Sequence, residues 1–310
     1  MPQSLKDDYM FNLGLYTITI IIWGSTWIIT KHQVSELSAL HSVLFRYLLA
    51  AFLLQGILYV FKSKEQHAIK IHFLFFLLGS TLFCWNYVLF YLAASTGLTT
   101  GLIAVIFSTI ITMNIANNAI IFRDFPQAGT VIGAMIGLLG IALVFFEDIQ
   151  LFKETGLLSA IGLCLFATYL ASLGNMFSKI LQRKEVSVVS ANKWGMTYGA
   201  ISLLIATIFF DRNVHLPTTF PFLSGLLFLA IFGSIIGFWT YLTLLGRVGA
   251  DKAAYAMIVF PIWSLMLSWF FEDFTWTPMK VIGVIIILTG NLFIVSKGNL
   301  NFGFGQNQNG

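Results

Sequence analysis

The chain has 310 residues, of which 58% are apolar and only 10% charged, with a mean hydropathy of +0.86. This composition excludes a protein that folds in water and indicates an integral membrane protein. The 17 Lys and Arg against 13 Asp and Glu give a net charge of +4, which in a membrane chain mostly reports orientation. Nucleic acid is therefore not expected as a partner. Cys84 and Cys164 fall inside apolar runs, so we expect no disulfide, metal site or cofactor.

Apolar runs separated by clusters of charge predict about ten membrane-spanning helices and an all-α fold. The expected spans are 11–30, 42–61, 72–94, 101–121, 129–146, 156–178, 190–210, 222–244, 253–271 and 281–296. Residues 1–10 are expected to precede the first span in the cytoplasm. The tail 297–310, rich in Gly, Asn and Gln, is expected to be disordered and cytoplasmic.

The distribution of Lys and Arg predicts where the two ends of the chain lie. With a cytoplasmic N-terminus, twelve of these side chains fall in inner loops or at inner helix ends and five lie outside. Cytoplasmic loops carry such an excess of positive charge. We therefore expect an N-in, C-in protein of the inner membrane.

Two segments recur within the chain. Phe122-Arg123-Asp124-Phe125 returns as Phe271-Glu272-Asp273-Phe274, and Val131-Ile132-Gly133 returns as Val281-Ile282-Gly283, at separations of 149 and 150 residues. Each copy, over 11–146 and 155–296, holds five spans. Because five is odd, the second copy enters the membrane from the opposite face, which predicts two inverted five-helix repeats. In transporters such repeats place a site near the midplane.

Polar side chains inside the spans are the candidate lining of that site, because hydroxyls and amides in hydrocarbon need partners or a wet cavity. On the first span they share one face, and an offset of 149 residues gives a matching face on the sixth. The candidates are Trp23, Thr26, Thr30, Trp85, Asn86, Ser108, Thr112, Tyr169, Ser172, Asn175, Lys179, Tyr198, Trp239 and Tyr241. The alternatives are hydrogen bonds between packed helices and, for the aromatic members, a belt at the membrane interface.

Charged side chains inside the spans are few. No Asp or Glu lies near the centre of a span, and Asp124, Glu147 and Glu272 fall at span ends, where water is expected to solvate them. Arg46 and Lys193 lie near the ends of the second and seventh spans. They could attract an anionic group such as a carboxylate, or extend to the water at the interface.

Glycine and proline predict how the helices pack. Gly129, Gly133, Gly137 and Gly140 allow close approach of another helix to the fifth span. The fifth and tenth spans carry few polar side chains and are expected to be peripheral supports, in a monomer or a weak homodimer. Pro261 lies inside the ninth span, where it is a candidate gating hinge or a static kink.

Several motifs taken in order resemble a known family over nearly the whole chain. They are Trp23-Gly24-Ser25-Thr26-Trp27, Arg46-Tyr47-Leu48-Leu49-Ala50-Ala51, Gly249-Ala250-Asp251-Lys252-Ala253, Phe260-Pro261, Phe271-Glu272-Asp273, and Gly283 to Gly290. In these motifs the chain resembles the EamA-type branch of the drug/metabolite transporter superfamily. The resemblance implies two inverted five-helix repeats, a central cavity lined by helices one to four and six to nine, and alternating-access movement of small metabolites, often amino-acid export from bacteria.

The chain departs from the pattern of that family in its first copy. Such proteins commonly have a proline in the fourth helix and a glutamate after it. Here Thr109 or Thr112 and Asp124 occupy those places.

Two other function classes compete with transport. An intramembrane enzyme would need a Ser/His pair or paired central carboxylates, whereas the five His residues fall in loops or at span edges. A membrane scaffold or sensor remains the main alternative. If the chain transports, aromatic, hydroxyl and amide side chains suit a zwitterion or an amphipathic organic molecule better than a metal ion.

Overall fold

The structure, a computed structural model, describes residues 3–60, 66–123, 125–126, 128–146, 157–248, 250–272 and 274–297, and no strand occurs among them. The all-α prediction is confirmed. The helices of the first half are α1 (Gln3–Glu36), α2 (Ala39–Val60), α3 (Ile69–Ser80), η1 (Thr81–Trp85), α4 (Asn86–Ser95), α5 (Thr100–Phe107), α6 (Ile110–Phe122) and α7 (Ala128–Val144). Those of the second half are α9 (Leu157–Gln182), α10 (Val188–Phe210), α11 (Phe220–Leu227), η2 (Phe228–Ile236), α12 (Gly237–Val248), α13 (Ala250–Phe271) and α14 (Pro278–Lys297). The tail expected to be disordered lies outside the described residues, apart from Lys297.

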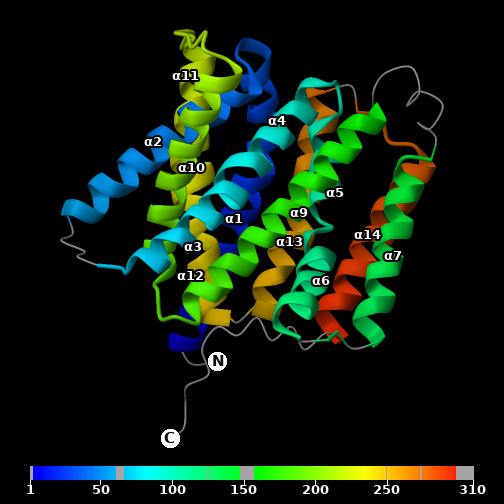
Figure 1. Cartoon of the computed structure of the whole chain (residues 1–310). Helices are drawn as coiled ribbons and strands as arrows, with labels where there is room; N and C mark the ends of the chain where they lie inside the picture. The colour runs from blue at the N-terminus through cyan, green and yellow to red at the C-terminus, as the bar shows by residue number, and fades with distance from the viewer. Residues whose placement is uncertain are drawn as a thin grey trace, which may run out of the picture.

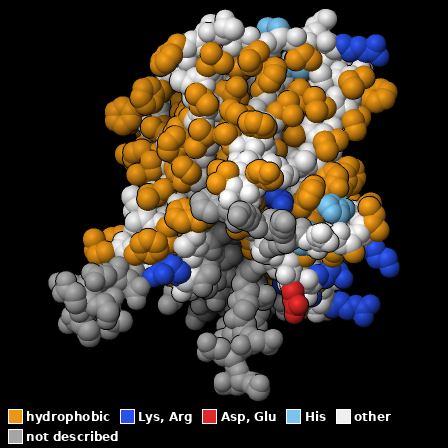
Figure 2. All heavy atoms as spheres, turned by 90° about the vertical axis from the view of Figure 1, so that its left-hand side faces the viewer, with side chains coloured by type: hydrophobic (Ala, Val, Ile, Leu, Met, Phe, Trp, Pro, Cys, Tyr) orange, Lys and Arg blue, Asp and Glu red, His pale blue; other side chains and the backbone are white. Residues whose placement is uncertain are grey.

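The described helices include ten apolar segments that match the predicted spans. Seven are long and apolar enough to span a bilayer, and three shorter apolar helices cover Ala128–Val144, Tyr255–Phe271 and Pro278–Ile294. They match the expected ranges, although the first helix continues to Glu36 rather than ending near residue 30. Hydrophobic side chains cover most of the height of the face shown in Figure 2, while charged side chains gather mainly toward its ends. The chain is therefore an integral membrane protein.

The helix ends and their connections lie at two opposite faces of the bundle. α1 begins and α14 ends at the lower side of Figure 1, which we call the terminal face. The connections α6–α7 and α9–α10 also lie there. We call the upper side the distal face, where α1 meets α2, α4 meets α5, α10 meets α11 and α13 meets α14.

The two repeats pack by exchanging equivalent partners. α1 packs against α12 and α13, and its counterpart α9 packs against α4 and α6. α2 and α10, the second helix of each half, pack against each other. Equivalent helices of the two halves therefore make equivalent contacts across the bundle. The prediction of two repeats is confirmed.

The π-helical segments η1 and η2 occupy equivalent places in the two repeats. A shift of η1 by 149 residues places it inside η2. A π-helical turn inserts a residue into the α-helical pattern and turns the following side chains to a different face. The two segments therefore set which side chains of α4 and α12 face the interior.

The fourth span of the first repeat is interrupted without a proline. α5 ends at Phe107 and α6 begins at Ile110. The hydroxyls of Ser108 and Thr109 each donate to the carbonyl three residues earlier, at 2.7 Å. Such side-chain bonds to the backbone compete with the helical ladder and bend helices. Hydroxyl chemistry in the first repeat thus produces a break where the second repeat has Pro261.

Glycine brings α7 and α14 into direct backbone contact at one side of the bundle (Figure 1). A Cβ atom on Gly133 would lie 2.8 Å from the carbonyl oxygen of Gly290, and one on Gly140 would lie 2.7 Å from that of Gly283. The glycine faces expected to contact another helix are thus turned toward each other. This arrangement supports the peripheral role expected for the two helices.

Substitution of one of these glycines should separate the two helices. A Cβ on Gly290 would lie 2.6 Å from the Gly137 nitrogen, so Gly290→Ala should lower the free energy of unfolding by about 1–3 kcal/mol. Gly162→Ala is the matched control, since no atom lies within 4 Å of its Cβ position on α9. Thermal unfolding in detergent measures both variants, and equal melting temperatures would contradict this account of the contact.

Candidate functional site

A cavity of about 200 Å³ lies between the two repeats. Its walls come from α1, α2, η1, α4, α5 and α6 of the first repeat and from α9, α10, α12 and α13 of the second. Neither α7 nor α14 contributes a lining residue. The first four spans of each repeat therefore build the cavity, as the resemblance implied.

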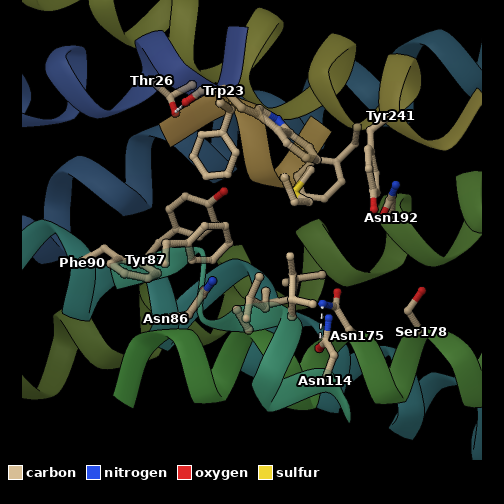
Figure 3. Close-up of a pocket in the computed structure, with 18 of the residues that line it drawn as sticks. Trp23, Thr26, Asn86, Tyr87, Phe90, Asn114, Asn175, Ser178, Asn192 and Tyr241 are labelled. Carbon is tan, nitrogen blue, oxygen red and sulfur yellow. Dashed lines mark hydrogen bonds between the residues drawn. The ribbon is translucent and has the colours of Figure 1, made fainter. Parts of the chain in front are cut away.

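The labelled side chains of Figure 3 surround the cavity from four sides. Trp23 and Thr26 lie on one side, and Asn114, Asn175 and Ser178 lie on the opposite side. Aromatic side chains from α4 and α12 close the flanks, with Asn86 and Asn192 beside them. The lining thus combines aromatic and aliphatic side chains with amide and hydroxyl groups at separate points.

Trp23 is fixed on the α1 wall by the second repeat. Its Nε1 donates to the Gly233 carbonyl at 3.3 Å, and its ring centroid lies 5.1 Å from that of Tyr241 and 5.4 Å from that of Phe238. A Cβ on Gly237 would lie 2.5 Å from the same Nε1. Only glycine at this position therefore leaves room for the indole.

The α6–α9 wall is a ladder of polar contacts. Asn117 Nδ2 donates to Ser172 Oγ at 2.9 Å, and Asn175 Nδ2 donates to Asn114 Oδ1 at 3.3 Å. Lys179 Nζ donates to the Asn118 amide oxygen at 2.6 Å. The polar face of α9 was expected either to line the cavity or to bond to a packed helix. Asn175 and Lys179 do both, because they line the cavity and also bond to α6. Ser172 joins the helices without lining the cavity.

The structure brings about half of the candidate residues together. Those on the cavity wall are Trp23, Thr26, Thr30, Asn86, Asn175, Lys179 and Tyr241, together with Arg46. Three aromatic candidates are exposed on the outer surface, where the interfacial belt is their simplest role; they are Trp85, Tyr169 and Trp239.

The other candidates make contacts away from the cavity. Ser108 is buried and bonds to its own helix, and Thr112 on α6 is not among the lining residues. The Tyr198 hydroxyl lies 3.0 Å from His72 Nδ1, across α10 and α3. Lys193 is 8% exposed and its Nζ lies 5.1 Å from the Trp194 ring centroid. None of these four side chains reaches the cavity.

Much of the lining carries no sequence signal. Apolar and aromatic side chains fill the space between the polar groups; among them are Trp27, Phe90, Phe107, Ile110, Ile111, Met257 and Phe260. In sequence they cannot be told from residues of the packed core. Tyr87, Asn114 and Asn192 also line the cavity. Because they are polar residues within spans, the sequence does mark them as candidates.

Arg46 does not extend to the interface. α2 begins at Ala39, so Arg46 lies about two turns, or roughly 10 Å, inside the helix. Its side chain is 1% exposed and contributes to the cavity wall. The alternative that the Arg46 side chain extends to the water at the membrane interface is therefore wrong.

A buried carboxylate joins three helices at the distal face. Glu272 Oε1 accepts from Lys31 Nζ at 2.6 Å, and Oε2 accepts from the Thr100 backbone nitrogen at 2.8 Å and from its hydroxyl at 2.6 Å. Ser268 on α13 donates to the same Oε2. The Glu272 side chain is 4% exposed, so the expectation that water solvates it is wrong. Asp124 and Glu147 lie outside the described residues.

These four residues, which we call the distal cluster, tie the ends of α1 and α13 to the start of α5. None of them lines the cavity. In the other direction the lining continues to Gln182 and Val188, which border the α9–α10 connection at the terminal face. The lining thus extends toward the terminal face, and on the distal side Thr30 of the lining is followed directly by Lys31 of the cluster.

The distal cluster should make stability depend on pH. Burial alone raises the pKa of the Glu272 carboxyl, but the hydrogen bonds from Lys31, Ser268 and Thr100 outweigh burial and hold the pKa below its usual 4.5. A carboxyl whose pKa is lower in the folded than in the unfolded protein stabilises the fold at any pH above its unfolded pKa. This stabilisation is lost as the pH falls through the folded pKa. Glu272→Gln should therefore lower the free energy of unfolding by about 1–3 kcal/mol at pH 7.

The measurement is the difference in melting temperature between wild type and Glu272→Gln across pH 3 to 7. This difference should begin to shrink as the pH falls below about 4.5, the usual pKa of the carboxyl, and it should be lost once the pH falls through the lower pKa of the folded protein, where the wild-type carboxylate is protonated. Glu185→Gln, at an exposed turn, is the control and should match wild type throughout. A pH-independent difference would refute the assignment to the carboxylate.

Comparison with known proteins agrees with this architecture. The model of the EamA-like transporter family matches residues 12–146 and 158–296. The chain is 23% identical over 289 residues to a Bacillus subtilis (strain 168) protein named uncharacterized transporter YoaV, covering 92% of this chain and 97% of that protein. It is 22% identical to the probable amino-acid metabolite efflux pump of Salmonella typhimurium (strain LT2), covering 93% of this chain and 94% of that protein. A crystal structure that is 13% identical, with a TM-score of 0.64, covers 93% of this chain and 98% of its own, and shows the fold alone.

Proposed function

Because the chain belongs to the EamA-like transporter family, we propose that it exports a small amino-acid-like metabolite across the cytoplasmic membrane by alternating access. The observation that carries this proposal is the cavity between the repeats, lined by aromatic and amide side chains. Its volume of about 200 Å³ suits a small metabolite, since pockets for drug-sized ligands begin at about 300 Å³. The name of the Salmonella relative, a probable amino-acid metabolite efflux pump, supports the same substrate class and direction.

Alternating access is supported by a difference between the two faces of the bundle: helices are bonded together at the distal face, whereas the cavity lining reaches the terminal face. The distal cluster joins α1, α5 and α13 on one side, while the lining continues toward the terminal face on the other. Pro261 lies on α13 between Phe260, which lines the cavity, and Ser268 of the cluster. A hinge at Pro261 would move Ser268 and Glu272 relative to the cavity and open the distal side.

Orientation gives this arrangement a direction. With both ends of the chain in the cytoplasm, the terminal face is cytoplasmic and the cavity receives its substrate from inside. Export then requires release of the distal cluster. We propose that one subunit suffices for transport, because the cavity walls come from a single chain and the glycine faces of α7 and α14 contact each other.

Counterflow in proteoliposomes tests transport. Vesicles loaded with an unlabelled amino acid should accumulate the same labelled amino acid, in a panel that also holds nucleosides, sugars and lipophilic cations. Asn192→Leu removes a polar group from the cavity wall and should weaken apparent affinity about tenfold. Asn213→Leu, in the exposed α10–α11 connection, is the matched control and should have no effect. Absence of counterflow for every compound would favour a scaffold or sensor and refute the proposal.

Labelling of single cysteines tests orientation. A cysteine at Lys184, in the exposed turn after α9, should be protected from an impermeant maleimide added to intact cells. One at Asn213, at the distal face, should be labelled. The native Cys84 and Cys164 are buried and should give little background. Labelling of the Lys184→Cys variant without that of Asn213→Cys would reverse the proposed topology.

A further inference from the structure

We infer that Arg46 binds the carboxylate of the transported substrate, which makes the cavity selective for amino acids over amines of the same shape. This inference rests on the proposed transport function and names the chemical group that the same cavity recognises. It follows from the burial of Arg46, from its neutral surroundings and from the way the second repeat positions it.

Arg46 is a buried cation without an acidic partner among the described residues. The ion pairs there join Lys31 to Glu272, His32 to Glu36 and His41 to Asp211, and none includes Arg46. A buried charge costs several kcal/mol unless it is paired or well bonded. An arginine kept on a cavity wall under these conditions is suited to an anion that arrives with the substrate.

The protein uses only part of the hydrogen-bonding capacity of the guanidinium. Nε donates to Ser234 Oγ at 3.2 Å, and Nη1 donates to the Tyr91 hydroxyl at 3.3 Å. The group also lies over the Tyr87 ring, with its carbon atom 4.5 Å from the ring centroid. A guanidinium has five N–H donors. The donors that remain can bind a carboxylate in the paired geometry that arginine favours.

The second repeat fixes the position of the guanidinium. Ser234 on η2 accepts from Arg46 while its own hydroxyl donates to the Leu229 carbonyl at 3.0 Å, so its orientation is set. A Cβ on the neighbouring Gly233 would lie 3.3 Å from Arg46 Nη2 and 2.9 Å from the Thr26 methyl group. Glycine at this point lets Arg46 and Thr26 approach the same stretch of η2. Because the Gly233 carbonyl also accepts from Trp23, the cation and the aromatic wall are positioned together.

The remaining cavity lining favours a zwitterion over a simple cation. Among the described residues its charged members are Arg46 and Lys179, both positive, and no described Asp or Glu lines it. Positive charge around the cavity repels an amine that lacks a carboxylate. Asn86, which also lines the cavity, has a buried Oδ1 without a hydrogen-bond partner among the described residues. A rotation of this amide would offer the oxygen to the ammonium group of an amino acid.

The test compares acids and amides on the wild-type protein. Purified transporter is titrated with L-leucine and L-phenylalanine and with L-leucinamide and L-phenylalaninamide, which keep the side chain and the amine but lose the carboxylate. We expect each amino acid to bind at least tenfold more tightly than its amide. Equal affinity for acid and amide would overturn the inference without recourse to any variant.

Variants then locate the effect. Arg46→Gln should weaken binding of both amino acids about 10- to 100-fold and remove the preference over the amides, while Arg46→Lys should restore part of it because the charge returns. Lys193→Gln is the matched control, since Lys193 is also a buried cation but lies off the cavity. If Arg46 only joins α2 to η2, Arg46→Gln will lower the melting temperature but leave the acid-to-amide ratio unchanged, which would overturn the inference.

The counterflow panel keeps the two proposals separable. Exchange of sugars, nucleosides or lipophilic cations without exchange of amino acids would overturn the role of Arg46 and leave transport in place. Failure of every compound to exchange would instead overturn the proposed function.

Discussion

Polar groups inside the spans must find partners within the protein or face its cavity, because hydrocarbon offers none. This constraint divides the side chains of the molecule. Large apolar residues such as Phe52 and Phe209 remain exposed on the outer surface, where lipid is their solvent. The amides of α6 and α9, the Glu272 carboxylate and the Arg46 guanidinium are turned inward. The interior polar groups therefore mark both the contacts between the repeats and the wall of the cavity.

Hydropathy and length were sufficient to predict the fold, because about 20 apolar residues in sequence are a direct record of a bilayer crossing. The recurrence of Phe122-Arg123-Asp124-Phe125 as Phe271-Glu272-Asp273-Phe274 similarly exposed the duplication. Hydropathy does not show which face of a helix turns inward after an irregular turn. Neither the π-helical segments nor the hydroxyl-bonded break at Ser108 and Thr109 has a pattern that a regular helical wheel would reveal.

The site was only partly predictable for the same reason. Because α1 is one uninterrupted α-helix, a regular wheel places Trp23 and Thr26 on one face, and both line the cavity. On the third and eighth spans, where η1 and η2 turn the helix, the predicted lining included Trp85 with Asn86 and Trp239 with Tyr241. Only Asn86 and Tyr241 reach the cavity, and both tryptophans are exposed. Phe107 and Phe260 posed a different problem, since an apolar wall and an apolar core have the same composition.

The connection between the cavity and the distal cluster runs through two helices. On α1, Thr30 lines the cavity and the next residue, Lys31, bonds to Glu272. On α13, Phe260 lines the cavity and Ser268 bonds to the same carboxylate two turns later, with Pro261 between them. Both helices also contact each other where Ser264 donates to the Gly24 carbonyl at 2.8 Å. Displacement of either wall would therefore act on the bonds of Glu272. Because the Glu272 side chain is only 4% exposed, breaking these bonds would require water to reach the carboxylate.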